Sequence, residues 1–179
     1  MTTRGLGGQP ERSLWDFAVD LYAAPGIAEA CLALQDRHHC DVNVVLFAAW
    51  MGAVRRDRVT GAEMAEIAAQ VAAWRDEIVR PLRAIRRRLK SGPSPAPSDA
   101  TDELRTRLKA AELDSERIEL LQLEALARKR HPTGDDPAKA SLDNLTQAVR
   151  LFTAAHVDAE ATRLIHVIQS AVAEKLARR

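Results

Sequence analysis

The chain has 179 residues, of which 46% are hydrophobic and only 4% aromatic, and its formal net charge at pH 7 is +1. This length fits one domain, or one domain with a helical extension. Many alanines and leucines with few aromatic residues favour packed helices over a β-sandwich. The near-zero net charge excludes a global electrostatic argument for a protein that binds nucleic acid or membranes.

The N-terminal region and the cysteines indicate the compartment. Residues 1–12 are rich in glycine and polar groups, so we expect a disordered N-terminus, and they contain no apolar core of a secretion signal. The longest uncharged apolar run, residues 44–54, has eleven residues, whereas a membrane-spanning helix needs about 20. We therefore expect a cytoplasmic protein without a membrane span, in which Cys31 and Cys40 remain reduced.

Four helical segments are expected between residues 13 and 90. The first two carry apolar residues at helical spacing, with Ser13 as the expected N-cap of the first, and they meet at Pro25-Gly26. Residues 44–54 are apolar on every side, which indicates a helix buried on all faces. A capping box at Thr60–Glu63 begins the fourth segment, which Pro81 should kink.

The stretch SGPSPAPSDA at residues 91–100 has the composition of a linker, with three prolines and no large apolar side chain. Two long helical segments follow it, separated by HPTGDDP with Asp136 as the expected N-cap. The sequence therefore predicts an all-α protein with a compact four-helix N-terminal unit, residues 13–90, followed by a long C-terminal helical hairpin, residues 101–179. The hairpin either packs on the first unit or self-associates, and its sign-alternating charges suit an exposed helix.

Two histidines, a cysteine and two aspartates crowd into the turn DRHHCD at residues 36–41. Neighbouring helical residues point about 100° apart, so few of His38, His39, Cys40 and Asp41 could share a metal ion, and no CxxC or HExxH spacing is present. A nucleophilic Cys–His pair lacks an orienting partner. A helix end capped by Asp41 explains the cluster, so the sequence predicts no metal, no cofactor and no catalytic residue.

The other polar residues of this region form the first candidate site. Asp36, Asp41 and Asn43 lead directly into the apolar helix and could line a small ligand-binding pocket, with Trp15 and Trp50 as apolar walls. In the alternative interpretation Asp41 caps the helix, and Asn43 lies in its first turn and bonds to the backbone.

The second candidate is the basic stretch RPLRAIRRRLK at residues 80–90, with six positive charges in eleven residues. Arg80, Arg83, Arg87 and Lys90 fall along one ridge of a helix, while Leu82, Ile85 and Leu89 are expected to face the core. Such a ridge could bind an anionic partner. Without interleaved aromatic residues or a nucleic-acid motif, a protein is favoured over nucleic acid; a solvated or internally paired face is the alternative.

Several segments together resemble a family of short bacterial proteins, mainly proteobacterial, that is uncharacterised. They are LWDF at residues 14–17, LYAAPG at 21–26, LALQD at 32–36, DVNVVLFAAW at 41–50, PLRAIRRRLK at 81–90 and AELDSERIEL at 111–120. The resemblance covers most of residues 13–125 and includes Asp36, Asp41 and Asn43, whereas family members usually have small residues in place of His38, His39 or Cys40. It implies an all-helical cytoplasmic protein and no activity.

Two functions follow from these observations. The first is a non-enzymatic interaction or assembly (adaptor) protein that uses the basic ridge and the C-terminal helices for partner binding or self-association. The second is a small-ligand-binding or catalytic helical protein built on Asp36, Asp41 and Asn43. The sequence favours the first without deciding whether the protein is an enzyme.

Overall fold

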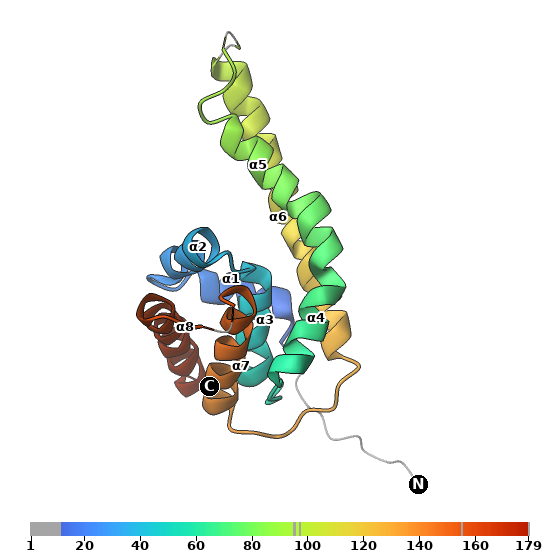
Figure 1. Ribbon diagram of the computed structural model, residues 1–179, viewed down its shortest axis with the longest axis vertical. Coiled ribbons are helices and arrows are strands. Elements are labelled where there is room, and N and C mark those ends of the chain that lie inside the picture. Colours follow the sequence, from blue (N-terminus) through green and yellow to red (C-terminus); the bar gives the residue numbers. More distant parts are fainter. Residues whose placement is uncertain (1–11, 95, 97, 155, 179) are drawn as a thin grey trace. The chain divides into compact units, whose positions relative to one another are not determined.

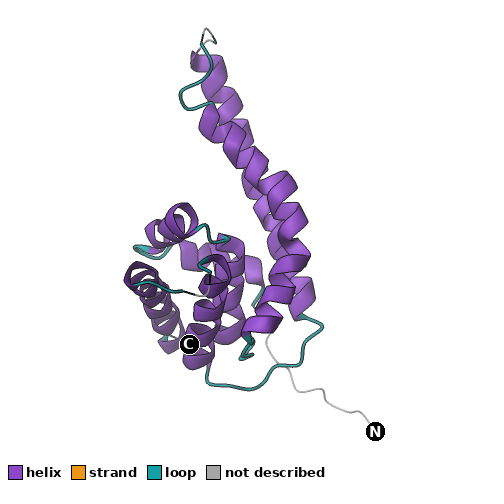
Figure 2. Ribbon diagram, viewed as in Figure 1, coloured by secondary structure: helices purple, strands orange, loops and turns teal. Residues whose placement is uncertain are grey.

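The computed structural model describes residues 12–94, 96, 98–154 and 156–178, and these residues form helices and connecting turns with no strand (Figure 2). The prediction of an all-α protein is confirmed. The elements are α1 (Leu14–Tyr22), α2 (Ile27–His38), α3 (Val42–Ala53), α4 (Gly61–Trp74), η1 (Arg75–Val79), α5 (Arg80–Arg88), α6 (Ser98–Ala127), α7 (Pro137–Phe152) and α8 (Ala159–Ala177). They form two units, residues 1–59 with 131–179 and residues 60–130.

Helix α3 is the centre of the first unit, because every residue from Asn43 to Ala53 is buried. The other helices of this unit, α1, α2, α7 and α8, pack around it, and α7 lies alongside it (Figure 1). Gly52 allows this close approach: a Cβ atom at this position would lie 2.1 Å from the backbone nitrogen of Ser141. The apolar run therefore forms the expected buried helix, with a partner on each side.

Polar contacts fasten the segment after α3 to α7. The fully buried Asn144 donates from Nδ2 to the carbonyl of Asp57 at 2.9 Å, and its Oδ1 accepts from the backbone N–H of Val59 at 2.8 Å. The carbonyl of Arg56 accepts from the backbone N–H of Gly134 at 2.9 Å. Residues about 80 positions apart in the chain are thus held together by paired backbone groups.

The expected helix starts are confirmed. The side chains of Ser13, Asp41 and Asp136 each accept a hydrogen bond from a backbone N–H in the first turn of α1, α3 and α7. Thr60 and Glu63 form the full capping box of α4. Each cap satisfies a donor that the helix itself leaves without a partner.

The second unit is a helical hairpin. One arm runs through α4, the π-helical turn η1 and α5, and the long helix α6 returns beside it (Figure 1). Pro81 lacks an N–H and its ring crowds the carbonyl four residues earlier, so an ordinary α-helical turn cannot continue through it. The irregularity expected at Pro81 takes the form of η1 immediately before it, where the N–H of Arg80 donates to the carbonyl of Arg75.

The helices group differently from the predicted division of the chain. Residues 91–100 connect α5 to α6 inside the second unit, and α7 and α8 belong with α1, α2 and α3. Because α3 is apolar on all sides, the short helices α1 and α2 cover only part of it, and α7 and α8 supply the remaining contacts. Of the predicted disordered N-terminus, residues 1–11 lie outside the described residues, and the carbonyl of Arg12 accepts a hydrogen bond from Trp50.

Candidate functional site

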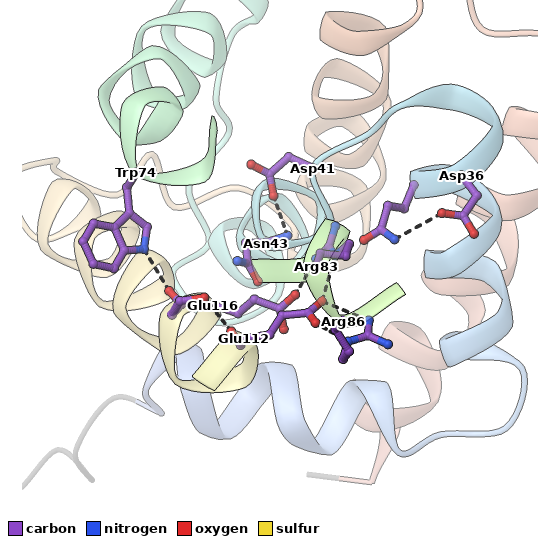
Figure 3. Close-up of polar contacts among 10 residues, drawn as sticks. Asp36, Asp41, Asn43, Trp74, Arg83, Arg86, Glu112 and Glu116 are labelled. Atoms are coloured by element: carbon purple, nitrogen blue, oxygen red, sulfur yellow. Dashed lines mark hydrogen bonds and ion pairs between the residues drawn. The ribbon is translucent and has the colours of Figure 1, made fainter. Parts of the chain in front are cut away.

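The three polar residues of the first candidate site lie near the turn between α2 and α3. Oδ1 of Asp41 accepts from the backbone N–H of Asn43 at 3.0 Å, so this carboxylate caps α3 (Figure 3). Asp36 lies on the exposed side of α2 and accepts a 3.3 Å hydrogen bond from Nε2 of Gln35 (Figure 3). Each of these bonds joins residues one or two positions apart, as expected for helix ends and helix surfaces.

The two tryptophans have different surroundings. Trp50 is 1% exposed, its Nε1 donates to the carbonyl of Arg12 at 2.9 Å, and its ring centroid lies 6.2 Å from that of Phe47. The guanidinium of Arg55 lies 5.7 Å from the same ring. Trp15 is half-buried on α1. Trp50 is therefore a core side chain with a satisfied polar group.

The thiols and histidines offer little chemistry. Burial raises the pKa of Cys31 to about 12, and burial together with the charge of Asp41 raises the pKa of Cys40 to about 12. Both thiols are therefore protonated at neutral pH, although a nucleophilic cysteine needs a thiolate. Across the described part of the chain, no group of three His, Cys, Asp or Glu residues is arranged to hold a metal ion.

The basic ridge divides into an outward and an inward part. Arg80, Arg87 and Lys90 are exposed, and Arg80 lies 2.8 Å from the exposed carboxylate of Asp76. Arg83 instead turns toward α6, where its Nε donates to Oε1 of Glu112 at 2.9 Å (Figure 3). The four ridge residues therefore do not form one outward-facing surface.

A cluster of charges joins α5 to α6 inside the hairpin. Arg83 also pairs with Glu116, and Arg86 pairs with Glu112 through both Nε and Nη2, the second contact being 3.1 Å (Figure 3). Burial raises the pKa of the Glu112 carboxyl, but hydrogen bonds from Arg86 and Arg83 outweigh it, so the pKa lies below its ordinary value. Trp74 strengthens the same arms by donating from Nε1 to the carbonyl of Ser115 at 2.9 Å.

This charge cluster leaves the apolar side of α5 in solvent. No residue of α5 is buried, and Ile85 is 50% exposed. The prediction that Leu82, Ile85 and Leu89 face the core is therefore wrong for Ile85, whereas Leu82 and Leu89 are half-buried. The arginines on the neighbouring face turn toward α6. The spacing of Glu112 and Glu116 opposite Arg83 and Arg86 is a signal for this packing, but only once the antiparallel register is known.

Helix α6 adds apolar residues to the same side of the hairpin. Leu104, Ala111 and Ile118 are spaced by seven residues and are all exposed. On α5 and on α6, the apolar residues lie about 90–120° around the helix axis from the residues of the charge cluster, and the rotation has the same direction when each helix is viewed from its N-terminus. Because the two helices are antiparallel, this common rotation places both sets of apolar residues on the same side of the hairpin. We call this surface the hairpin apolar face; its residues are Ile78, Leu82, Ile85, Leu89, Leu104, Leu108, Ala111 and Ile118.

Among the described residues, no single helix is both long enough and apolar enough to cross a membrane. Helices α1 and α2, which are bent by 101° relative to one another, reach the length and apolar composition of a membrane span only when the two are counted together.

Comparison with known families matches residues 13–123 to a family described as "Protein of unknown function (DUF2390)". The match covers more than half of the chain. The chain belongs to this family. The expectation of an uncharacterised family is confirmed at that level. The DUF2390 match runs from α1 into α6, and so includes Asp36, Asp41, Asn43 and the charge cluster of the hairpin. Neither the curated proteins nor the solved structures give a significant match.

Proposed function

We propose that this protein is a non-enzymatic interaction protein that binds a protein partner through the hairpin apolar face. The observation that carries the proposal is the exposure of large apolar side chains on α5 and α6: Ile85 is 50%, Leu104 42% and Ile118 41% exposed. A contiguous apolar surface of this kind in a folded protein commonly marks an interaction site. The arginines that could have shielded it are held by Glu112 and Glu116.

Positive charge near the hairpin apolar face adds a second feature. Residues 80–110 contain nine basic and three acidic residues, and Arg80, Arg87 and Lys90 are exposed. Arg80 and Arg87 lie two positions from Leu82, Ile85 or Leu89, and therefore on the other side of α5 from the apolar face. The excess of positive charge still steers a complementary partner toward this part of the hairpin and raises the association rate. We therefore propose an acidic protein, and not nucleic acid, as the partner that this charge attracts.

The setting that we propose is the bacterial cytoplasm. The quoted sequence segments resemble those of a bacterial, mainly proteobacterial family. Both cysteines are free thiols, as is usual in a reducing compartment.

The alternative function, a small-ligand-binding or catalytic protein built on Asp36, Asp41 and Asn43, has less support. Asp41 uses one carboxylate oxygen to cap α3, and Trp50 uses its indole N–H on a backbone carbonyl. Native mass spectrometry and elemental analysis of the untagged protein test this alternative directly. A stoichiometric small molecule or metal ion retained by the wild type but lost in Asp41→Asn would favour it.

A quantitative enrichment experiment tests the proposed function. The full-length protein, Ile118→Asp and Leu113→Asp are each immobilised, and proteins captured from a lysate of the source organism are measured. Leu113 is the matched control, because it is 53% exposed on α6 but lies on the other side of the hairpin. We expect a defined protein set that wild type and Leu113→Asp retain and Ile118→Asp loses, with the lead member binding again as purified protein. Equal capture by all three would overturn the proposal.

A further inference from the structure

The hairpin apolar face carries features of a self-complementary surface. Several of its members are spaced by seven residues on both arms of the hairpin, Leu82 to Leu89 and Leu104 to Ala111 to Ile118. Seven-residue spacing keeps side chains on one side of helices that cross at about 20°. A second pair of helices with the same spacing would therefore match this face along its length.

Charge along the hairpin runs from positive to negative. The half next to the turn, residues 80–110, has nine basic and three acidic residues, a net charge of +6. The remaining half, residues 60–79 and 111–130, has nine acidic and five basic residues, a net charge of −4. The pairs formed by Glu112 and Glu116 with Arg83 and Arg86 remove two charges from each side and leave the polarity unchanged.

We infer that the hairpin apolar face binds a second copy of this chain, packed antiparallel across a two-fold axis. This inference rests on the proposed use of the face as a contact surface and names its occupant. In a two-fold arrangement the same patch faces itself. Antiparallel packing then brings the positive half of each copy onto the negative half of the other, whereas parallel packing would bring like charges together.

The position of the face along α5 sets the register. On the arm that contains η1 and α5, the face runs from Ile78 to Leu89, so the two-fold axis passes near residues 83 and 84. Residues equally far from this point meet across the axis, which places Ile78 of one copy near Leu89 of the other. Leu82 of one copy likewise lies near Ile85 of the other, so apolar side chains meet apolar side chains.

The size of the face limits the affinity. The α6 side, residues 104–118, is roughly 22 Å long, and two helices are about 20 Å wide, so the apolar footprint is about 400 Å². A standard interface buries about 800 Å² from each partner. The charged flanks must supply the rest, and we expect a micromolar dimer that weakens as salt is added.

Sedimentation velocity of the full chain over about 1–100 μM tests the inference. We expect a concentration-dependent dimer for wild type and for Leu113→Asp, and at least about a tenfold higher dissociation constant for Ile85→Asp. Ile85 is half exposed, and a circular dichroism melt verifies that the variant is folded. A wild type that stays monomeric throughout, or an Ile85→Asp protein that dimerises like wild type, would overturn the inference.

Charge reversal tests the orientation. We expect Arg88→Glu and Glu77→Arg each to weaken the dimer, because Arg88 lies in the positive half and Glu77 in the negative half, and antiparallel packing sets these halves against each other. Tighter dimers of Arg88→Glu would contradict antiparallel packing. A monomeric wild type that still captures a partner in an Ile118-dependent manner would refute the second copy as occupant and leave the proposed function standing.

Discussion

Glu112 shows how one residue determines the packing of two helices. Its carboxylate is buried in the hairpin and accepts from both Arg83 and Arg86, whose side chains remain 20% and 25% exposed. Burial of a charge is costly unless it is paired and hydrogen-bonded. The carboxylate and the two guanidinium groups are therefore favourable only together, and removal of the shared acid leaves two partly buried cations close to one another.

We predict that Glu112→Gln lowers the unfolding free energy by about 1–3 kcal/mol, since charged hydrogen bonds contribute more than neutral ones. Urea denaturation followed by circular dichroism measures the loss. Asp102→Asn is the matched control, because Asp102 is an exposed α6 carboxylate 3.7 Å from Arg105. Its loss should be below about 0.5 kcal/mol. Equal losses in the two variants would contradict the structural role of Glu112.

Glu63 makes the stability of α4 depend on pH. A hydrogen bond from Arg130 and the capping contacts with Thr60 lower the pKa of its carboxyl from 4.5 to about 2. A carboxyl with a lowered folded-state pKa contributes stability that is fully present above the unfolded value of 4.5. This contribution is lost as the pH falls through 4.5 toward 2.

We therefore predict that Glu63→Gln lowers the melting temperature at pH 7 and has a smaller effect near pH 2. Thermal unfolding at a series of pH values measures the difference. Glu66→Gln, which removes an exposed carboxylate from the same helix, provides the comparison and should leave the pH profile nearly unchanged. A Glu63→Gln deficit that stays constant from pH 7 to pH 2 would refute the assignment.

At the scale of the elements, the contact between α3 and α7 depends on a missing side chain. A Cβ atom on Gly52 would meet the backbone of Ala140 and Ser141 at 2.1–2.5 Å, and backbone atoms cannot rotate away as a flexible side chain can. Glycine inside a helix normally costs about 1 kcal/mol relative to alanine. Here the close helix contact that it permits outweighs that cost.

We predict that Gly52→Ala lowers the unfolding free energy by roughly 2 kcal/mol or more, because the two helices must separate. Gly134→Ala is a control that introduces backbone strain without steric overlap. Nothing lies within 4 Å of the position that its Cβ atom would take, but its φ of +76° is unfavourable for alanine. That variant should lose about 1 kcal/mol. A Gly52→Ala protein as stable as wild type would contradict the packing of α3 on α7.

Helix α5 is an element whose pattern can be interpreted in two ways. Its leucines and isoleucine form an apolar stripe beside a basic stripe, which usually indicates that the apolar side is buried. In the hairpin the basic side meets α6 because Glu112 and Glu116 lie opposite it. The choice between the two faces is made by residues about 30 positions away in the chain.

The whole chain folds into two units, and the hairpin sequence, residues 60–130, interrupts the sequence of the first unit. Each helix makes its main contacts within its own unit. A destabilising change in one unit should therefore act mainly on the helices of that unit.

We predict that Gly52→Ala increases amide hydrogen exchange in α3 and α7 more than in α5 and α6, and that Glu112→Gln does the reverse. Hydrogen exchange with mass spectrometry, at the peptide level, measures both variants against wild type. Each variant serves as the control for the other. Uniform acceleration over the whole chain in both variants would show that the two units open as one.

Much of the local structure could be predicted from the sequence. The starts of α1, α3, α4 and α7 follow from their capping residues, and the burial of α3 follows from its composition. The role of Asp41 as a cap was one of two open interpretations, and the structure shows that hydrogen bond. The hairpin apolar face was missed, because an exposed stripe and a buried stripe have the same spacing.

Helix positions and helix starts follow from the sequence, because capping and helical periodicity involve residues within about one turn of each other. In contrast, the helices that cover α3 and the side of α5 that meets α6 are set by the tertiary fold. These outcomes depend on contacts such as Gly52 with Ser141 and Arg83 with Glu112, which join distant parts of the chain. Such contacts compete with other pairings of the same stripes, and local spacing does not distinguish between them.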